Sequence, residues 1–357
     1  MARVIGRVST GVAASFDHAV NALALSRRSA RSRARSRSES LGPSERERAL
    51  AALAARYEDP RLFESPDAFF PHPERAAVRQ IAVRSFGRAG EVADLTWESG
   101  YVPFNPDVAE RYLRSDANRT AHARCFVHRD GPRPAVVLIH GYMGGTPGVE
   151  ERAWPIDWMF RRGLDVVLGV LPFHGPRGPG PFRRPPFPGS DPRMTVEGFR
   201  HAIADLRALA DWLRCRGSRA VGAMGMSLGG YTTALWATVD PLAFAVPFIP
   251  LASVADFARE GGRLVGTPAE QERQHELLEA VYRVVSPLAR PVRVPPEGRL
   301  VVAGRADRIT PMSHAERLAA HFEAPLEVFP GGHLLQLGRA RGFRAVGRML
   351  GRLGLLE

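Results

Sequence analysis

A serine flanked by glycines is the residue of this sequence best placed to act as a nucleophile. Ser227 stands in the run GMSLGG (225–230), where an apolar segment passes into a helix-like one. A sharp strand-to-helix turn projects a serine hydroxyl above a sheet, and it needs glycines on both sides because larger residues would clash there. The start of the next helix also presents amides and a positive dipole end to negative charge beside the hydroxyl. An ordinary tight turn with an incidental serine has the same pattern, so partners elsewhere in the chain decide its meaning.

Two groups that could assist the serine follow it in the chain, each just after a strand-like run. Asp307 lies in GRADRITP and His333 lies in PGGHLLQ. A neutral imidazole can take a hydroxyl proton near pH 7 and return it to a leaving group, while a carboxylate on its other nitrogen fixes the tautomer. Asp307 also suits the role of a helix cap, and Asp256 is the alternative acid. We predict Ser227 as nucleophile, His333 as general base and Asp307 as the acid that orients it.

A second glycine-rich run, HGYMGG (140–145), follows the apolar segment AVVLI. The tetrahedral intermediate of acyl transfer needs two main-chain N–H donors, one just after the nucleophile and one from an early loop of this kind. We predict the backbone amides of Tyr142 and Leu228 as these donors. The residues predicted to line the substrate pocket are His140, Gly141, Met143, Met226 and His174.

The pattern of apolar runs indicates how these groups are positioned. From residue 134 onward, short apolar runs alternate with amphipathic stretches, which predicts an α/β fold with a mostly parallel sheet and helices on both faces. Open sheets of this kind carry their ligands at the carboxyl ends of the strands. The eight predicted strands are 93–104, 120–128, 135–140, 164–172, 220–226, 243–249, 299–304 and 326–330. The predicted helices are 44–57, 149–162, 195–216, 228–239, 312–322 and 334–350.

The net charge of +12 is unevenly distributed along the chain. Residues 1–48 hold ten arginines against four acidic residues, so half of the excess lies in this segment. The basic run 26–40 lacks the interleaved aromatic residues that stack on nucleic-acid bases, so no specific nucleic-acid partner is predicted. We predict a basic, partly flexible N-terminal extension with helical segments (1–90) and an α/β domain (91–357) with a helical cap inserted at about 252–297.

The remaining composition excludes several classes of protein. Two cysteines, Cys125 and Cys215, cannot form the framework of a small secreted scaffold, which favours a reducing, cytoplasmic compartment. No run approaches eighteen apolar residues, and Asp17 and His18 interrupt the N-terminal stretch, so neither a transmembrane segment nor a signal peptide is predicted. No H-E-x-x-H or Cys/His ligand spacing occurs, so no metal and no cofactor are predicted. Nothing in the sequence indicates an oligomeric state.

From about residue 90 to its end, the chain resembles the α/β-hydrolase superfamily. The resemblance is carried by HGYMGG, GMSLGG, GRADRITP and GGH, in the order expected for that fold. The stretch LPFHGPRGPG (171–180) is also similar to the P-x-H-G-x-R stretch of dienelactone-hydrolase-like and prolyl-oligopeptidase-like esterases. The segment before residue 90 is not part of the common core of that superfamily, and segment 252–297 matches no lid that we can assign.

The resemblance implies acyl transfer to water through a covalent acyl-serine, with no metal or organic cofactor. Apolar residues near the serine point to small-molecule carboxylic esters or thioesters with an apolar acyl part. These residues are Tyr142, Met143, Met226, Leu228 and, from the predicted cap, Leu264 and Val265. A peptidase or amidase with the same three residues is one alternative, and a non-catalytic hydrolase-like binding protein is another.

Overall fold

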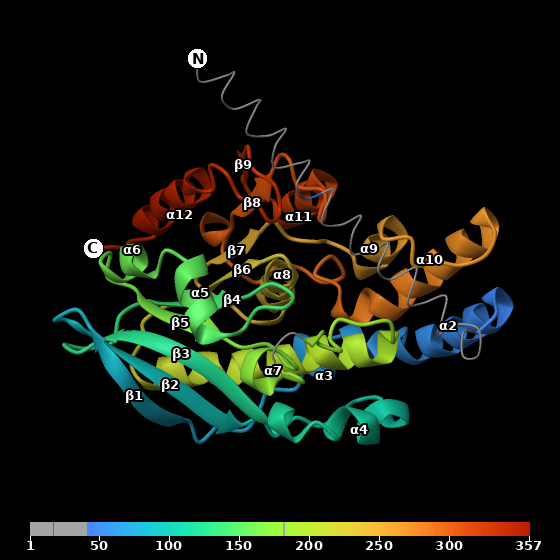
Figure 1. The fold of residues 1–357 in the computed structure, drawn as a ribbon, viewed down its shortest axis with the longest axis horizontal. Coiled ribbons are helices and arrows are strands. Elements are labelled where there is room, and N and C mark those ends of the chain that lie inside the picture. The colour runs from blue at the N-terminus through green and yellow to red at the C-terminus, as the bar shows by residue number, and fades with distance from the viewer. Residues whose placement is uncertain (1–16, 18–40, 181–182) are drawn as a thin grey trace, which may run out of the picture.

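The computed structural model describes residue 17, residues 41–180 and residues 183–357. Its centre is a nine-stranded sheet in the order β1-β2-β3-β5-β4-β6-β7-β8-β9, with helices on both sides (Figure 1). Neighbouring strands from β1 to β5 in this order pair antiparallel, and those from β5 to β9 pair parallel. The predicted α/β fold class is therefore confirmed. The strands are β1 (Arg79–Phe86), β2 (Gly90–Glu98), β3 (Thr120–His128), β4 (Ala135–Ile139), β5 (Asp165–Gly169), β6 (Val221–Met226), β7 (Ala245–Phe248), β8 (Val301–Gly304) and β9 (Leu326–Phe329).

The sheet has one strand more than predicted, because β1 carries no burial signal. Seven of its eight residues are exposed and the eighth is partly buried. It lies at the sheet edge and pairs with β2 alone. A strand exposed on both faces need not alternate apolar and polar residues, so periodicity does not reveal it. Residues 79–86, which fall in the predicted N-terminal extension, thus belong to the sheet. The basic run 26–40 lies outside the described residues.

The parallel strands β4 to β8 are buried on both faces, which explains their nearly continuous apolar sequences, whereas the edge strand β9 is mostly only partly buried. All five residues of β4 are buried. Val137 and Ile139 point into a core shared with α7 (Pro192–Cys215) and α8 (Leu228–Val239). Val136 and Leu138 point into the opposite core, shared with α6 (Ile156–Phe160) and α12 (Ala340–Arg352). The sheet is thus held rigidly between two apolar layers, and its loops are free to carry polar groups.

The remaining helices follow the predictions closely, with two exceptions. The helix predicted at 149–162 is broken at Pro155, which lacks the N–H that a continuous helix requires. The helix predicted at 334–350 begins only at Ala340, because residues 330–338 form a compact turn instead. Among the described residues, no helix is both long and apolar enough to cross a membrane. The other helices are α2 (Pro43–Tyr57), α3 (Pro66–Phe69), α4 (Pro106–Leu113), α5 (Pro147–Ala153), α9 (Val254–Glu260), α10 (Pro268–Tyr282) and α11 (Met312–Phe322).

Segment 252–297, predicted as an inserted cap, contains α9 and α10. A capping box begins α10, since Thr267 and Glu270 bond each other's backbone amides. The helix then packs along α2 (Figure 1), where Arg273 forms an ion pair with Glu47 at 3.1 Å. Near the end of α2, Tyr57 is fully buried in the main core. The segment therefore forms a helical layer together with α2, and its role as a cap stays a prediction.

Candidate active site

Ser227 lies in the strained turn that joins β6 to α8. Its backbone has φ 57° and ψ −113°, a region that side chains rarely adopt. A Cβ atom on Gly225 would come within 2.1 Å of the Gly229 carbonyl oxygen. A Cβ atom on Gly229 would come equally close to the carbonyl oxygen of Ile139. Both glycines are therefore required for the tight approach of helix to sheet, as the sequence pattern indicates.

The structure brings Ser227, His333 and Asp307 into one hydrogen-bonded chain. Ser227 Oγ lies 2.9 Å from His333 Nε2, and His333 Nδ1 lies 2.8 Å from Asp307 Oδ2. The side chains of His333 and Asp307 are 8% and 1% exposed, whereas the serine is only partly buried. Ser227 is thus the most solvent-exposed member of this hydrogen-bonded series, and His333 and Asp307 are successively more buried.

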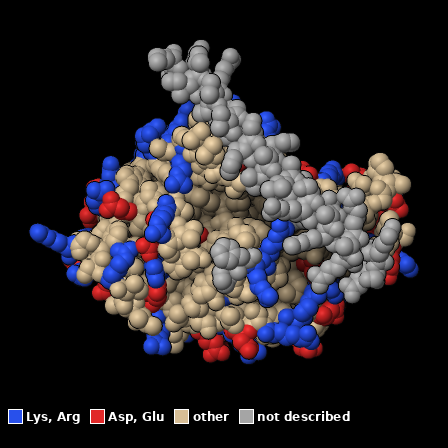
Figure 2. Space-filling view, viewed as in Figure 1, with Lys and Arg blue, Asp and Glu red and all other residues tan. Residues whose placement is uncertain are grey.

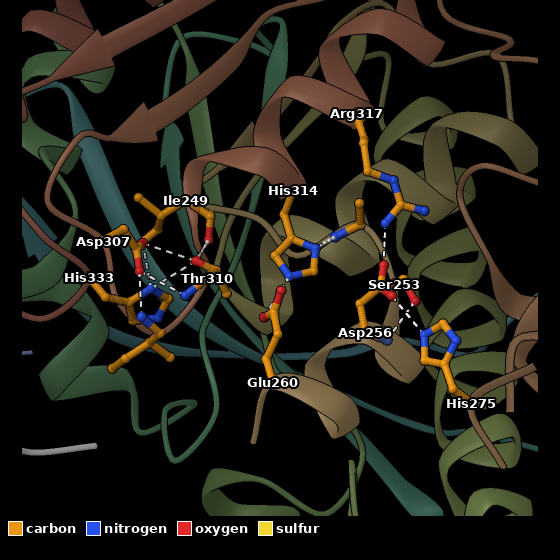
Figure 3. A network of polar contacts seen from close by, with 12 residues as sticks. Ile249, Ser253, Asp256, Glu260, His275, Asp307, Thr310, His314, Arg317 and His333 are labelled. Atoms are coloured by element: carbon orange, nitrogen blue, oxygen red, sulfur yellow. Dashed lines mark hydrogen bonds and ion pairs between the residues drawn. The ribbon is translucent and has the colours of Figure 1, made fainter. Parts of the chain in front are cut away.

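The carboxylate of Asp307 is held in place by a turn of its own loop (Figure 3). Its Oδ1 atom accepts hydrogen bonds from the amides of Ile309 and Thr310, at 2.9 and 2.8 Å. The Thr310 hydroxyl lies 3.0 Å from Asp307 Oδ2 and 3.1 Å from the carbonyl oxygen of Ile249. Sequence reasoning missed Thr310, although an aspartate three residues before a threonine is typical of such a side-chain turn. Asp307 therefore braces its loop as well as facing the imidazole.

Asp256, the alternative acid, faces a different histidine. Its carboxylate lies 2.7 Å from His275 Nε2 and also pairs with Arg317 (Figure 3). Burial alone would raise the pKa of Asp256, but Arg317 and His275 hold it below the ordinary value. Asp256, His275 and Glu279 form a group whose potential metal-ligand atoms lie within 4.8 Å of one another. The carboxylate of Asp256 already accepts a hydrogen bond from Arg317, and that of Glu279 accepts one from the Ser253 hydroxyl.

The glycine-rich loop after β4 lies against the nucleophile. A Cβ atom on Gly141 would be 3.5 Å from the Cβ atom of Ser227. Tyr142 follows directly, and its hydroxyl donates to the Pro185 carbonyl oxygen at 3.0 Å. Leu228 is the first residue of α8, where backbone amides have no acceptor within the helix. The two amides predicted to bind an oxyanion therefore belong to segments that flank Ser227.

Two of the predicted pocket residues, His140 and His174, are buried at 2% and 1% exposure. The Nε2 atom of His140 accepts a hydrogen bond from the Leu171 amide at 3.0 Å, and its Nδ1 lies 2.8 Å from the Gly141 carbonyl oxygen. Burial lowers the pKa of His140, and burial with the neighbouring His140 lowers the pKa of His174 to about 3. His140 thus ties the loop after β4 to the loop after β5, while the ring of His174 bonds the Pro172 carbonyl oxygen of its own loop and packs against His140.

The other predicted pocket residues differ in exposure. Met143 is 52% exposed, whereas Met226 is 8% exposed and lies beside Gln336. Sequence reasoning also missed Glu150, whose buried carboxylate accepts a hydrogen bond from the Gly145 amide at 2.9 Å. An acidic side chain on the helix after a glycine-rich loop is the only sequence signal for such a brace.

Backbone strain is concentrated at the carboxyl ends of four neighbouring parallel strands. Five non-glycine residues in the described part of the chain have positive φ angles, and four of them follow β4, β5, β6 and β7. These four are Met143, Phe173, Ser227 and Ile249. Strained residues gather at functional sites, and open parallel sheets bind ligands at this edge. The backbone thus marks the same edge as the hydrogen-bonded side chains.

Comparisons with known proteins agree with this fold. Residues 194–327 match the prolyl oligopeptidase family. An uncharacterized protein of Mycobacterium tuberculosis, Rv2627c, is 34% identical over 295 residues, covering 80% of this chain and 70% of that protein. The structure is similar to acetyl xylan esterase 1 from Thermoanaerobacterium sp., with a TM-score of 0.56 and 18% identity over 84% of this chain and 93% of the other. An acetyl xylan esterase from a Paenibacillus species gives a TM-score of 0.55 at 16% identity, over 86% and 92% of the two chains.

The chain therefore shares a family with the mycobacterial protein Rv2627c, has the α/β-hydrolase fold, and matches the prolyl oligopeptidase family over part of its length. The resemblance noted in the sequence motifs is confirmed.

Proposed function

We propose that this chain hydrolyses carboxylic esters through an acyl intermediate on Ser227. The observation that carries the proposal is the chain of contacts from the Ser227 hydroxyl through His333 to Asp307, at 2.9 and 2.8 Å. Because the hydroxyl and the carboxylate face opposite nitrogens of the ring, the imidazole can accept the hydroxyl proton while its other N–H stays bonded to Asp307.

The reaction follows in two halves. Ser227 Oγ attacks the ester carbonyl while His333 Nε2 takes its proton, and the backbone amides of Tyr142 and Leu228 stabilise the oxyanion that forms. His333 then returns the proton to the alcohol as the carbon–oxygen bond breaks, which leaves the acyl-serine. In the second half, His333 activates a water molecule, the acid is released, and the Ser227 hydroxyl is restored.

The exposed apolar residues on the loops around Ser227 support substrates with an apolar acyl part. Met143 and Tyr142 on one loop are 52% and 37% exposed, and Leu334 beside the histidine is 48% exposed. Such an apolar rim favours uncharged acyl chains, as esters or thioesters of small molecules. The names of the two acetyl xylan esterases indicate acetyl esters for those proteins, so the shortest acyl group belongs in the same test.

The match to the prolyl oligopeptidase family favours one alternative, a peptidase or amidase that uses the same three residues. The chemistry differs in the leaving group, since an amine must be protonated by His333 before it departs.

The two functions separate in one set of measurements on the full chain. We would compare p-nitrophenyl esters of two to twelve carbons, a matching thioester and aminoacyl p-nitroanilides, each with Ser227→Ala as control. We expect a pre-steady-state burst of p-nitrophenol and a higher kcat/KM for esters than for anilides. A higher kcat/KM for the anilides would favour the peptidase, and equal turnover by Ser227→Ala would overturn both.

A further inference from the structure

The loop that carries His333 is bound by a carboxylate from the far end of the chain. Asp17 Oδ2 accepts a hydrogen bond from the backbone amide of His333 at 2.5 Å. Its Oδ1 atom accepts one from the amide of the next residue, Leu334, at 3.0 Å. The two contacts span 316 and 317 residues of sequence, so they join Asp17 directly to the catalytic edge of the sheet.

This arrangement resembles the way proteins bind anions. Successive backbone N–H groups that point to the same side form a concavity that favours a negative charge. Asp17 is fully buried, and a buried carboxylate is stable only when hydrogen bonds compensate for its lost hydration. Within the described ranges, Asp17 provides the acceptor for both of these amides. The carboxylate and the two amides therefore satisfy one another.

The contact completes the restraint of His333. The side chain of this residue is held on one nitrogen by Asp307, and its carbonyl oxygen accepts a hydrogen bond from the Gln336 amide group at 3.1 Å. The loop itself has few backbone–backbone hydrogen bonds. One of them joins the Gly332 amide to the Leu335 carbonyl oxygen at 3.0 Å. Without Asp17, the amide of His333 would lose its partner at the point where the ring must stay aligned with Ser227.

We infer that Asp17 is a positioning residue of the active site, whose carboxylate holds the His333–Leu334 backbone so that the imidazole stays aligned with Ser227. The inference rests on the proposed function, because it assigns a task to Asp17 only if His333 is the base. Small errors in the placement of a catalytic group reduce the rate of the chemical step more than they reduce binding.

The test uses full-length Asp17→Asn and Asp17→Ala. Asp17→Asn keeps the shape of the side chain but places an NH₂ group against one of the two backbone amides. Asp17→Ala removes the carboxylate and leaves space for a small anion. We expect kcat for an ester to fall about ten- to hundred-fold in Asp17→Ala, with KM within about two-fold of wild type. Added formate should restore part of the lost kcat in Asp17→Ala, since it can bind the two vacated amides. Asp116→Asn, which removes an exposed carboxylate, is the matched control and should behave as wild type.

Three outcomes are informative. A kcat within two-fold of wild type in both Asp17 variants would overturn the inference. A loss of activity that follows a loss of thermal stability, and that formate does not relieve, would overturn it too, because Asp17 would then serve only the fold. If Ser227→Ala is as active as wild type, the proposed function fails, but amide hydrogen exchange of peptide 330–338 still tests the contact. Exchange there should be faster in Asp17→Asn than in wild type, and unchanged exchange would contradict the contact.

Discussion

The Ser227 set and a second set around Ser99 contain the same three residue types in different arrangements. Ser99, just after β2, lies 2.7 Å from His201 Nε2 and donates directly to Asp205 at 2.5 Å. Arg177 pairs with Asp205 at 2.7 Å and lies 3.0 Å from the same Nε2 atom. In this set the hydroxyl, the carboxylate and the guanidinium all crowd one ring nitrogen. In the Ser227 set, the hydroxyl and the carboxylate face opposite nitrogens.

The difference shows why residue types alone do not define a catalytic site. Arg177 is fully buried and contacts the same His201 nitrogen that faces Ser99, while the Ser99 hydroxyl donates its proton to Asp205 instead of to the ring. Burial also lowers the pKa of His201. The Arg177 guanidinium further donates to the carbonyl oxygens of Val170 and Asn118, so this set ties the loop after β5 to its neighbours. The Ser99 set is therefore a brace, and the arginine of the LPFHGPRGPG stretch belongs to it.

The sharpest test of this comparison removes the serine hydroxyl from each set in turn. Ser227→Ala should lower kcat/KM for an ester by about 10⁴-fold or more, because the nucleophile is lost. Ser99→Ala should leave kcat/KM within about three-fold while lowering stability by about 1 kcal/mol, the usual contribution of a hydrogen bond. Steady-state kinetics and urea unfolding of both variants provide the measurement. Comparable losses of kcat/KM in the two variants would contradict the distinction.

The next effect concerns the acid of the Ser227 set. Asp307→Asn should lower kcat about 10³- to 10⁴-fold, since an amide in this place cannot hold the required tautomer of His333. Asp256→Asn, at the alternative acid, should change kcat by less than about three-fold, because that carboxylate faces His275 and Arg317. A reversed order in these two rates would transfer the acid role to Asp256.

The third effect is on stability and its pH dependence. Asp205→Asn should lower the free energy of unfolding at pH 7 by about 3–5 kcal/mol, because it leaves the buried Arg177 without its counter-charge. Asp130→Asn, in an exposed pair with Arg133, should cost less than about 1 kcal/mol. Urea unfolding of both variants against wild type measures the two costs.

The sign of the pH dependence follows from the same carboxylate. Burial would raise the pKa of Asp205, but Arg177 and His201 hold it well below its ordinary value. A depressed folded-state pKa adds stability above the unfolded value of about 3.9, and this stability is lost as the pH falls. Wild type should therefore lose stability more steeply than Asp205→Asn as the pH falls from about 5 toward the depressed pKa of Asp205. Parallel curves for the two proteins would contradict this origin of the acid sensitivity.

The smallest effect separates a brace near the site from one far from it. Thr310→Val keeps the shape of the side chain and removes the hydroxyl beside Asp307, so kcat should fall about ten-fold with KM unchanged. Thr238→Val removes a buried hydroxyl that bonds the Leu235 carbonyl oxygen at the far end of α8, and it should leave kcat unchanged. Equal kcat values in the two variants would show that Thr310 supports only the loop.

The fold was predictable from the sequence where both faces of a strand are buried. Strands β4 to β8 have short apolar sequences, and the ends of β6, β8 and β9 place Ser227, Asp307 and His333 on one edge of the sheet. β1 escaped prediction because its two faces are exposed and its sequence has no period. The break at Pro155 divided a helix that periodicity alone makes continuous.

The supporting groups of the site were less predictable, because their roles depend on contacts distant in sequence. Arg177 reaches Asp205 only after α7 packs on the sheet, and Asp17 meets His333 across 316 residues. His140 and His174 follow strands, as pocket residues do, yet the loops above them bury both rings. Spacing along the chain reveals which strand end carries a group, but it does not reveal what closes over that group. The chain contains no lysine, and in Figure 2 its arginine side chains are spread over the visible face among acidic ones, a distribution that total charge does not convey.

The most direct test of the account is to find which serine is activated. A fluorophosphonate probe reacts with a serine only where a base takes its proton and amides stabilise the phosphoryl oxygen. We expect peptide mapping of the labelled full chain to place the probe on Ser227, with labelling lost in Ser227→Ala and greatly slowed in His333→Ala. A probe found on Ser99 or on any other residue, or labelling that persists in Ser227→Ala, would contradict the account.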